Sequence, residues 1–506
     1  MGRSWLVPAV ASRGMVSSNG STRNISVGIV GAGFGGVGMG IRLRQEGIED
    51  FEIFERGETV GGVWRANTYP GAACDVPSHL YSFSFAPGHN WSRRYAPQPE
   101  IQEYMEEITD RFGMRSHLRL GTEVTGADFD QDSARWTLTL DSGKSREFDL
   151  LVTACGQLTR PQVPDVEGIE DFEGRVFHSA EWDHSHDLAG RNVAVIGTGA
   201  SAIQFVPEVA KEAAQLTIYQ RSAPWILPKT DREYPEWERS IFERFPARVA
   251  AARAGFFMFF EAGTYGFTGT SWVLKPFRKV AEAYRSSELK DEPELYARAT
   301  PDYEVGCKRV LFTSDWYATL REPNVELLNG AVQRATATGV VGADGVERAA
   351  DTIIWGTGFD ASRFVSPMDV HGLEGRSLDE FWGESPEAFL GTTVSGFPNM
   401  FLMYGPNTNL AVGTIIFMIE SQMAYVIDAL RTLSRRGVTA IDVRGDVQRR
   451  ENDRLQSAFQ QSIWTNCNSW YRVGNDGKIT NNWPDYMSAY RKKTKAVDVD
   501  EYELIA

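Results

Sequence analysis

Four short apolar runs along the chain each lead directly into a glycine-containing turn. They end in IVGAG (29–33), VTACG (152–156), VIGTG (195–199) and IIWGTG (353–358). After the first and the third of these runs, the pattern becomes helix-like and is followed by a second apolar run, FEIFE (51–55) and QLTIYQRS (215–222) respectively. Each succession predicts a strand, a turn, a helix and another strand. The chain is therefore expected to be an α/β protein with two Rossmann-like dinucleotide-binding domains.

The stretch after residue 360 has no glycine fingerprint of its own. We therefore expect it to return to the first unit and complete it, so that the second unit is inserted in the first. Between about 228 and 302 the sequence becomes charged and helix-like, with aromatic residues mixed in. This helical insertion could roof a substrate cleft, or it could be a surface elaboration with no part in the chemistry. Residues 1–24 are predicted to be a disordered tail.

Length and charge limit the possible partners. A chain of 506 residues is too long for one compact core. The formal charge of −15 argues against nucleic acid or an anionic membrane as the main ligand. The longest aromatic-apolar run, at 255–263, is far shorter than the roughly 20 residues of a membrane span. The sequence does not predict the oligomeric state.

The four cysteines, Cys74, Cys155, Cys307 and Cys467, are widely scattered. They form no CxxC pair for zinc or a redox dithiol, and no dense disulfide framework. We expect no metal site, and a reducing, cytoplasmic location fits this cysteine usage best.

The first unit carries the features of an adenosine-binding site. Gly31, Gly33 and Gly36 occupy the GxGxxG positions, where missing side chains allow a tight turn, the approach of a pyrophosphate and close helix packing. Glu55 lies 24 residues after Gly31, at the end of the second strand. A carboxylate there can accept both ribose hydroxyls, which favours FAD. The first part of the FAD domain is expected to span 25–157, and the second part, with a C-terminal loop, 360–506.

The second unit differs at the position that selects the nucleotide. Gly197 and Gly199 are followed by Ala202, a permitted substitute for the third glycine. The residue 24 positions after Gly197 is Arg221, not an acid. A guanidinium suits a 2′-phosphate, so this unit, expected at 158–359, is predicted to bind NADPH. The alternative is that Arg221 is a solvated surface arginine.

Two dinucleotide units could serve a disulfide reductase, a hydroxylase or an oxygenase. A disulfide reductase needs a pair of cysteines a few residues apart beside the flavin, and the sequence has none.

Three motifs resemble those of one known family. Phe172, Gly174, His178, Trp182 and Asp183 spell F-x-G-x-x-x-H-x-x-x-W-D; the other two motifs are GGVWRANTYPGAACD (61–75) and GCKRVLF (306–312). Together they are similar to the motifs of the Baeyer–Villiger monooxygenases, over roughly residues 25–490. The N- and S-oxygenating flavin monooxygenases resemble the first motif only up to the final Trp-Asp, and they remain the alternative.

The resemblance implies a role for each motif residue. Arg309 would be the catalytic arginine that stabilises a negatively charged flavin peroxide, with Asp75 behind it, and Lys308 would help to hold the 2′-phosphate. Without the surrounding motifs, a Lys-Arg pair that opens a strand would be read as a solvated edge. His178 would link the domains rather than transfer a proton, with a purely structural histidine as the alternative. The implied cofactor contacts are Val63, Trp64, Asp75, Tyr81, Val124, Thr198, Gly199, Ala200, Ser201, Ala202, Gln204, Arg221, Ser222, Lys308, Arg309, Ile415 and Trp470.

The implied reaction uses FAD, NADPH and dioxygen to convert a ketone to an ester or lactone. Two other classes remain open: an N- or S-oxygenating monooxygenase with the same cofactors, and a flavoprotein that binds both cofactors without turnover. The sequence does not identify the ketone.

Overall fold

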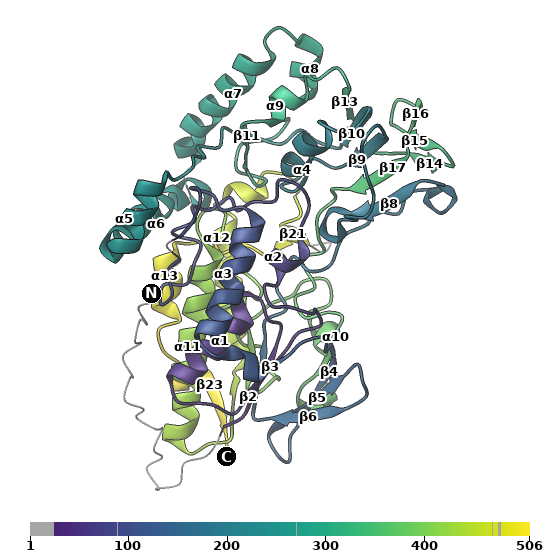
Figure 1. Cartoon of the computed structure of the whole chain (residues 1–506). Helices are drawn as coiled ribbons and strands as arrows, with labels where there is room; N and C mark the ends of the chain where they lie inside the picture. Colours follow the sequence, from purple (N-terminus) through teal and green to yellow (C-terminus); the bar gives the residue numbers. More distant parts are fainter. Residues whose placement is uncertain (1–24, 89, 270, 468, 474–476) are drawn as a thin grey trace.

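The computed structural model describes residues 25–506 apart from 89, 270, 468 and 474–476. The predicted disordered tail at 1–24 lies outside the described residues. Figure 1 shows two sheets in separate parts of the molecule, with a group of teal helices beside the second.

The first sheet is five-stranded and entirely parallel, in the order β19-β7-β1-β2-β3. Strand β7 is buried along its whole length and β1 along all but its last residue, as expected for a parallel sheet covered on both faces. Helix α1 joins β1 to β2 and packs against α11. The elements are β1 (Val27–Val30), α1 (Phe34–Gln45), β2 (Phe51–Phe54), α2 (Val63–Ala66), α3 (Gln98–Arg111), β3 (Leu118–Arg119), β7 (Leu150–Thr153), β19 (Met400–Leu402) and α11 (Ile415–Arg436).

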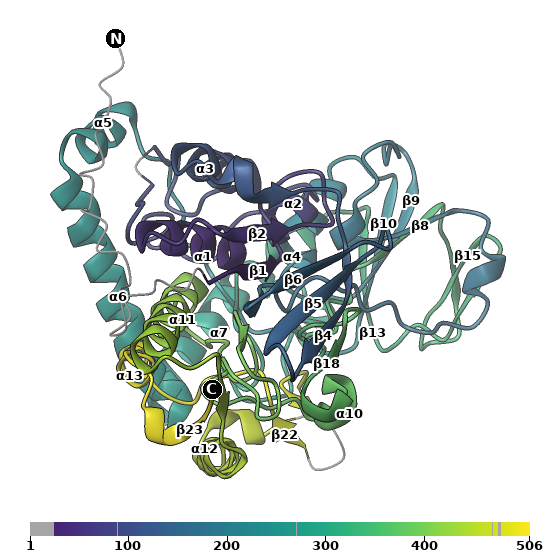
Figure 2. The same cartoon turned by 90° about the horizontal axis from the view of Figure 1, so that it is seen from below.

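A four-stranded sheet of order β18-β4-β5-β6 lies beside the first one (Figure 2). The inward residues of its strands form a core with residues of the first sheet, including Leu151 and Met400. This sheet was not predicted from the sequence, although β5 alternates strictly between half-buried and buried positions. Its strands are β4 (Val124–Asp130), β5 (Arg135–Leu140), β6 (Ser145–Phe148) and β18 (Asp369–His371).

The second dinucleotide sheet is also five-stranded and parallel, in the order β13-β10-β9-β17-β8. A small antiparallel sheet, β14-β15-β16, extends from it at the right of Figure 1. The elements are β8 (Arg175–His178), β9 (Asn192–Ile196), α4 (Ala202–Val209), β10 (Gln215–Gln220), β13 (Val325–Asn329), β14 (Arg334–Thr336), β15 (Gly339–Val341), β16 (Glu347–Ala349) and β17 (Thr352–Trp355).

The chain leaves β17 and returns to the first sheet at β19. The predicted fold class is therefore confirmed: two Rossmann-like units, the second inserted in the first.

The two crossings between the units are hydrogen-bonded to each other. The outgoing segment at Arg160–Gln162 pairs with the returning segment at Gly358–Asp360: Gln162 N donates to Gly358 O over 2.9 Å, and Asp360 N donates to Arg160 O over 3.0 Å. The two units are thus connected by a pair of strands rather than by two independent linkers.

Helices interrupt the second unit, as the sequence predicts. They lie between the short strands β11 and β12, which pair in parallel, and α6 runs along one flank of the molecule (Figures 1 and 2). These elements are β11 (Ile226–Leu227), α5 (Glu236–Arg244), α6 (Pro246–Thr268), η4 (Ser271–Leu274), α7 (Lys275–Leu289), α8 (Pro293–Arg298), β12 (Leu311–Phe312) and α9 (Trp316–Thr319).

The C-terminal region packs against the first unit and ends in a two-stranded sheet of β20 and β23. Its elements are α10 (Leu378–Trp382), β20 (Ala440–Val443), α12 (Gly445–Phe459), β21 (Arg472–Val473), β22 (Lys478–Ile479), α13 (Met487–Lys493) and β23 (Tyr502–Ile505). In the described part of the chain, no helix combines the length and the apolar character needed to cross a membrane.

A disulfide joins Cys307 to Cys467. The scattered cysteines gave no indication of it, because the two positions are 160 residues apart and meet only in the folded chain. The bond fixes the residue before Lys308 and Arg309 to the C-terminal loop that carries Trp470.

Candidate functional site

A cavity of about 1920 Å³ lies where the two dinucleotide units and the helical insertion meet. Residues from all three parts line it, including Gly31 and Glu55 of the first unit, Ser201 and Arg309 of the second, and Phe259 of the insertion. In open α/β sheets, ligands bind beyond the carboxyl ends of the strands, and these turns lie at that end.

The glycines of the first turn leave room for close approach. Gly31 has φ +104°, and a Cβ there would lie 2.5 Å from the Ala154 carbonyl oxygen. A Cβ at Gly36 would lie 1.8 Å from the Gly31 oxygen, so this glycine permits tight helix packing. Gly33 faces a second glycine turn, since a Cβ there would lie 3.4 Å from Gly62 Cα. Gly31 and Gly33 line the cavity; Gly36 does not.

Glu55 ends β2 at the cavity wall. Its carboxylate accepts hydrogen bonds from Ala32 N over 2.9 Å and from Gly57 N over 2.8 Å, and only 7% of the residue is exposed. These backbone donors hold an anionic acceptor at the first turn, where an adenosine ribose would lie.

The other first-unit candidates also line the cavity: Val63, Trp64, Asp75, Tyr81, Val124 and Ile415. Trp64 Nε1 donates to the Tyr81 hydroxyl over 3.0 Å, and the rings meet edge to face. Burial raises the pKa of Tyr81 far above its usual value, so the hydroxyl remains a neutral hydrogen-bonding group.

Asp75 and Arg309, 234 positions apart, meet in the cavity. Arg309 Nη2 lies 3.1 Å from Asp75 Oδ2. Half of the arginine side chain remains accessible, whereas the aspartate is 12% exposed. Burial is the largest single effect and opposes the charge on Arg309, but the negative charge of Asp75 together with the nearby Tyr471, Tyr404 and Cys74 outweighs it, so the pKa of Arg309 is raised. The site therefore presents a permanent cation, held from behind by a carboxylate.

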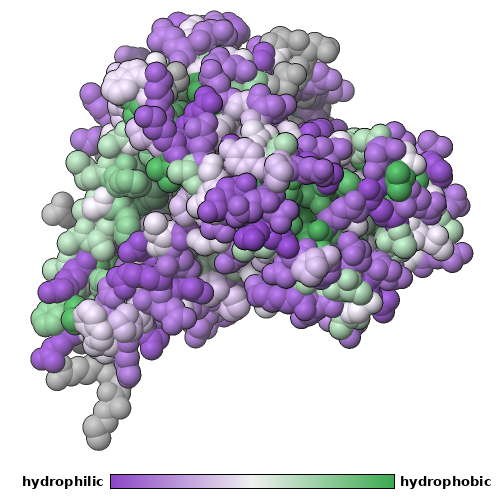
Figure 3. Space-filling model, turned by 90° about the horizontal axis from the view of Figure 1, so that it is seen from above, coloured by the Kyte–Doolittle hydropathy of each residue, from purple (hydrophilic) through white to green (hydrophobic). Residues whose placement is uncertain are grey.

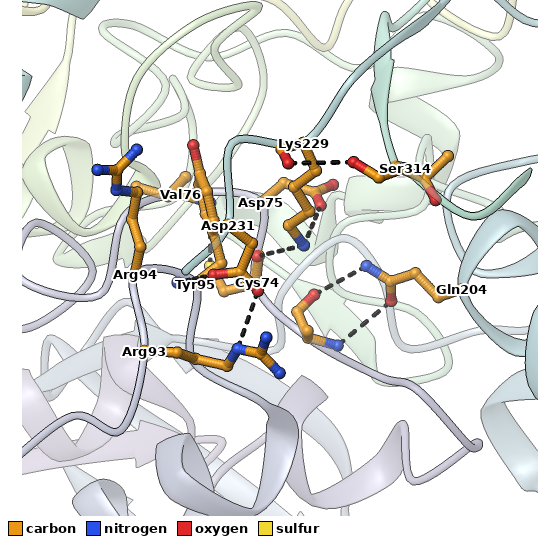
Figure 4. Close-up of polar contacts among 12 residues, drawn as sticks. Cys74, Asp75, Val76, Arg93, Arg94, Tyr95, Gln204, Lys229, Asp231 and Ser314 are labelled. Carbon is orange, nitrogen blue, oxygen red and sulfur yellow. Dashed lines mark hydrogen bonds and ion pairs between the residues drawn. The ribbon is translucent and has the colours of Figure 1, made fainter. Parts of the chain in front are cut away.

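A third charged residue, Lys229, completes this cluster and was not predicted from the sequence. Lys229 Nζ donates to the Cys74 carbonyl oxygen over 3.1 Å and lies 3.5 Å from Asp75 Oδ1. Figure 4 shows the side chain pointing toward Asp75. The ammonium also lies 5.0 Å from the centre of the Tyr95 ring. Asp75 is thus held between two cations, one on each carboxylate oxygen.

The backbone around Lys229 is fixed to both units. Ser314 Oγ donates to the Lys229 carbonyl oxygen over 3.1 Å, and Arg93 forms an ion pair with Asp231 at 2.9 Å (Figure 4). No local motif surrounds Lys229 in the sequence, so only the tertiary contact identifies it.

The second glycine turn contributes some, but not all, of the predicted contacts. Ala200, Ser201 and Gln204 line the cavity, whereas Thr198, Gly199 and Ala202 do not. Gln204 Nε2 donates to the Ala73 carbonyl oxygen over 3.0 Å, and its Oε1 accepts from Tyr69 over 3.0 Å. Gln204 therefore holds the segment that carries Asp75 against the second unit.

Arg221, Ser222 and Lys308 come together at the end of β10. Lys308 Nζ donates to Ser222 Oγ over 3.0 Å and lies 4.4 Å from the centre of the Tyr303 ring. Burial lowers the pKa of Lys308, and the positive charge of Arg221 lowers it further, against the attraction of Asp302. Lys308 lines the cavity; Arg221 and Ser222 lie outside its lining. Two neighbouring cations beside a hydroxyl form a favourable place for a phosphate dianion.

The F-x-G-x-x-x-H-x-x-x-W-D residues form a structural unit around β8, and none of the five lines the cavity. Phe172 is buried, and Trp182 packs edge to face on Phe177. Asp183 pairs with Arg175 at 2.6 Å. His178 accepts from Ala180 N over 3.1 Å and lies against Phe359, beside the crossing between the units.

The cysteines at the cavity are not a redox pair. Cys74 and Cys155 line the cavity and are both unpaired. Burial raises the pKa of each thiol to about 12, so neither is a thiolate nucleophile at neutral pH. Within the described residues, no group of three or more His, Cys, Asp or Glu side chains could hold a metal ion.

The site fits the two cofactors that its turns predict. The first unit combines glycine turns that leave space for a pyrophosphate with a buried carboxylate for a ribose. The second unit has cations at the corresponding place. Trp470, 46% exposed on the C-terminal loop, lines the cavity beside both units.

Comparison of the chain with known proteins points to the same class of enzyme as this geometry does. A model of the family "Flavin-binding monooxygenase-like" matches residues 24–253. A Baeyer-Villiger monooxygenase of Pseudomonas aeruginosa is 43% identical, over 96% of this chain and 92% of the relative. Two solved structures cover 95% of the chain and 99% of their own: oxidized steroid monooxygenase bound to NADP (29% identical, TM-score 0.85) and the OTEMO complex with FAD and NADP (25%, TM-score 0.84).

The fold, the two cofactor sites and these relatives define an FAD-dependent monooxygenase that uses NADPH. More specifically, the chain belongs to the Baeyer–Villiger monooxygenase family. The predicted enzyme class and cofactors are thereby confirmed.

Proposed function

We propose that the chain converts a ketone to an ester or lactone, with one oxygen atom taken from dioxygen and one NADPH consumed. The observation that carries this proposal is the Arg309–Asp75 pair at 3.1 Å, with Arg309 half accessible in the cavity. Oxygen insertion next to a carbonyl requires an anionic oxygen nucleophile and then an anionic adduct. A permanent cation stabilises both.

The chain's own residues supply binding, orientation and charge. Bound FAD supplies the redox and oxygen chemistry, and NADPH supplies the reducing equivalents. Asp75 orients the Arg309 guanidinium, and Lys229 holds the other oxygen of Asp75. The ketone carbonyl would accept a hydrogen bond from the free part of the guanidinium. The cavity walls, once the cofactors and the substrate fill the cavity, would limit access of water to the developing charge.

We also propose the cofactor assignments for individual residues. FAD would be held by the turn at Gly31–Gly36, by Glu55 and by the Val63, Trp64, Tyr81, Val124 and Ile415 side chains. NADPH would be held by the turn at 197–204, with its 2′-phosphate on Arg221, Ser222 and Lys308, and with Trp470 beside the nicotinamide. The parallel sheets support domain bounds of 25–157, 158–359 and 360–506.

A cytoplasmic location remains our proposal. It is supported by the dependence on NADPH, while the Cys307–Cys467 disulfide is a point against it, since such bonds are rare in reducing compartments.

Incubation of the holoenzyme with NADPH, oxygen-18 gas and a panel of cyclic, linear and aryl ketones tests the reaction. The expected product is an ester or lactone that carries one heavy oxygen atom, formed in step with NADPH oxidation. Formation of sulfoxides or N-oxides from added sulfides and amines, with no ester from any ketone, would contradict the proposal and favour the N- or S-oxygenating alternative.

Replacement of Lys229 by methionine should lower the turnover number by between about tenfold and a hundredfold, because Asp75 would lose one of its two cations and Arg309 its fixed position. The apparent KM for NADPH should stay within about twofold, because Lys229 is not among the 2′-phosphate ligands. Steady-state kinetics measure both values.

Lys229→Arg, which retains the charge, should recover much of the turnover. Lys279→Met, which removes an exposed lysine of α7, is the matched control. An equal loss in Lys229→Met and Lys279→Met would show that Lys229 does not position the site.

A further inference from the structure

The wall that α6, η4 and α7 of the helical insertion contribute to the cavity is entirely apolar. Every lining residue between 252 and 280 is glycine, alanine, proline or a larger hydrophobic residue, and the largest are Phe256, Phe259, Phe260, Phe267 and Phe277. They recur at helical spacing on α6 and α7, so one face of each helix is turned toward the cavity. The charged residues of the same helices, such as Arg278 and Lys279, are not part of the lining.

The outer part of this wall is exposed although it is hydrophobic. Phe259, Phe277 and Val280, here called the rim residues, line the cavity and are 63%, 37% and 50% exposed. Figure 3 shows hydrophobic residues gathered on the flank where α5 and α6 lie. A contiguous exposed apolar surface is unfavourable in water unless a ligand or partner covers it.

Packing within the fold does not account for the rim residues. Phe257, their neighbour on α6, packs on Phe417 of α11 with ring centres 5.1 Å apart. Phe260 and Phe267 pack against a hydrophobic core that the second unit, with its insertion, shares with the C-terminal region. Phe259 meets the Phe260 ring edge to face, with ring centres 5.6 Å apart. Neither Phe259 nor Phe277 takes part in the buried cores of the described residues, and both line the cavity.

The cavity lining therefore has a polar part and an apolar part. Arg309 and Asp75 provide charge in the polar part, and the insertion provides the apolar part. A ligand that contacts both parts has a carbonyl and a large body without hydrogen-bonding groups.

We propose that the substrate is a ketone with a large apolar body, such as a long alkyl chain or a fused-ring skeleton, which the rim residues cover when it is bound. This assignment rests on the proposed carbonyl oxygenation and adds the substrate class to it. Small ketones reach Arg309 but leave the rim exposed, so they gain none of the stabilisation that the rim provides.

A series of linear methyl ketones from 2-butanone to 2-dodecanone tests the assignment in the holoenzyme. The kcat/KM for ester formation should rise by roughly twofold to fourfold for each added methylene until the chain passes the rim. Phe259→Ser and Phe277→Ser should each lower the ratio of kcat/KM for 2-dodecanone to that for 2-butanone by about tenfold.

Met258→Ser is the matched control. Met258 is 66% exposed on α6, next to Phe259, but does not line the cavity. The control should keep the wild-type ratio. A preference of the wild type for 2-butanone, or equal losses in Met258→Ser and Phe259→Ser, would overturn the assignment while leaving the ketone reaction intact.

Measurements of ketone binding distinguish an error in the substrate class from an error in the proposed reaction. Dissociation constants for the same ketones follow from absorbance changes of the oxidised bound flavin and require no turnover. If no ketone yields an ester but binding tightens with chain length and weakens in Phe259→Ser, the reaction is wrong and the apolar substrate class stands. If affinity does not depend on chain length, the substrate class is wrong.

Discussion

Arg309→Ala should still allow NADPH to reduce the bound flavin but should lower ester formation by at least about 10³-fold. Reduction of the flavin by NADPH would not depend on this guanidinium, whereas the anionic oxygen nucleophile and its adduct would lose the permanent cation that Arg309 provides. An unpaired anion that is removed from bulk water is costly. Anaerobic stopped-flow measurement of flavin bleaching, alongside product analysis by mass, separates the two steps.

Arg309→Lys is the informative companion to this variant. It retains a positive charge but loses the planar donors that bind Asp75 and a carbonyl together, so partial recovery is expected. If Arg309→Ala forms ester at wild-type yield, the pair with Asp75 is a structural ion pair and the assignment of the catalytic arginine is wrong.

Arg221→Ala should raise the apparent KM for NADPH by about tenfold to a hundredfold and change the KM for NADH by less than about twofold. The reason is that Arg221 and Lys308 supply the charge for a 2′-phosphate, which NADH lacks. Steady-state oxidation of each coenzyme in the presence of a ketone gives the two constants.

Arg191→Ala is a suitable control, because Arg191 immediately precedes β9 and lies at the end of the sheet opposite the glycine turn. It should leave both constants near their wild-type values. Equal effects of Arg221→Ala on NADPH and NADH would mean that Arg221 does not touch the 2′-phosphate.

The parts of the fold that were predicted correctly have local signatures. Each central strand of the two parallel sheets is a short apolar run that ends in a glycine turn, and the turn at Gly31 needs a backbone conformation that glycine adopts readily. The four-stranded sheet beside the first unit was missed because its edge strands are short and polar on one face. Glycine fingerprints mark dinucleotide-binding turns and do not indicate strands of this kind.

The charged cluster at the cavity depends on contacts that no local pattern encodes. Asp75, Lys229 and Arg309 come from three segments and meet only after the second unit docks on the first. The resemblance to a family indicated Asp75 and Arg309, whereas no feature of the sequence indicated Lys229. The Cys307–Cys467 disulfide was not predicted either, because the two cysteines are 160 residues apart and meet only in the folded chain.

The helical insertion was predicted as helices, but its role was left open between a roof and a surface elaboration. Sequence alone does not say which face of an aromatic-rich helix is turned inward, because α6 carries phenylalanine on several faces. The structure resolves this point: Phe256, Phe259 and Phe260 line the cavity, while Phe257 packs on α11.

The paired crossings at Arg160–Gln162 and Gly358–Asp360 also limit how the enzyme can move. A single flexible linker would let the NADP unit swivel freely. Two hydrogen-bonded backbone segments act as a short two-stranded ribbon. Such a ribbon bends easily out of its plane but resists twisting and stretching. Opening and closing of the cavity would then follow one arc, so Arg309 would return to the same place beside Asp75 after every catalytic cycle.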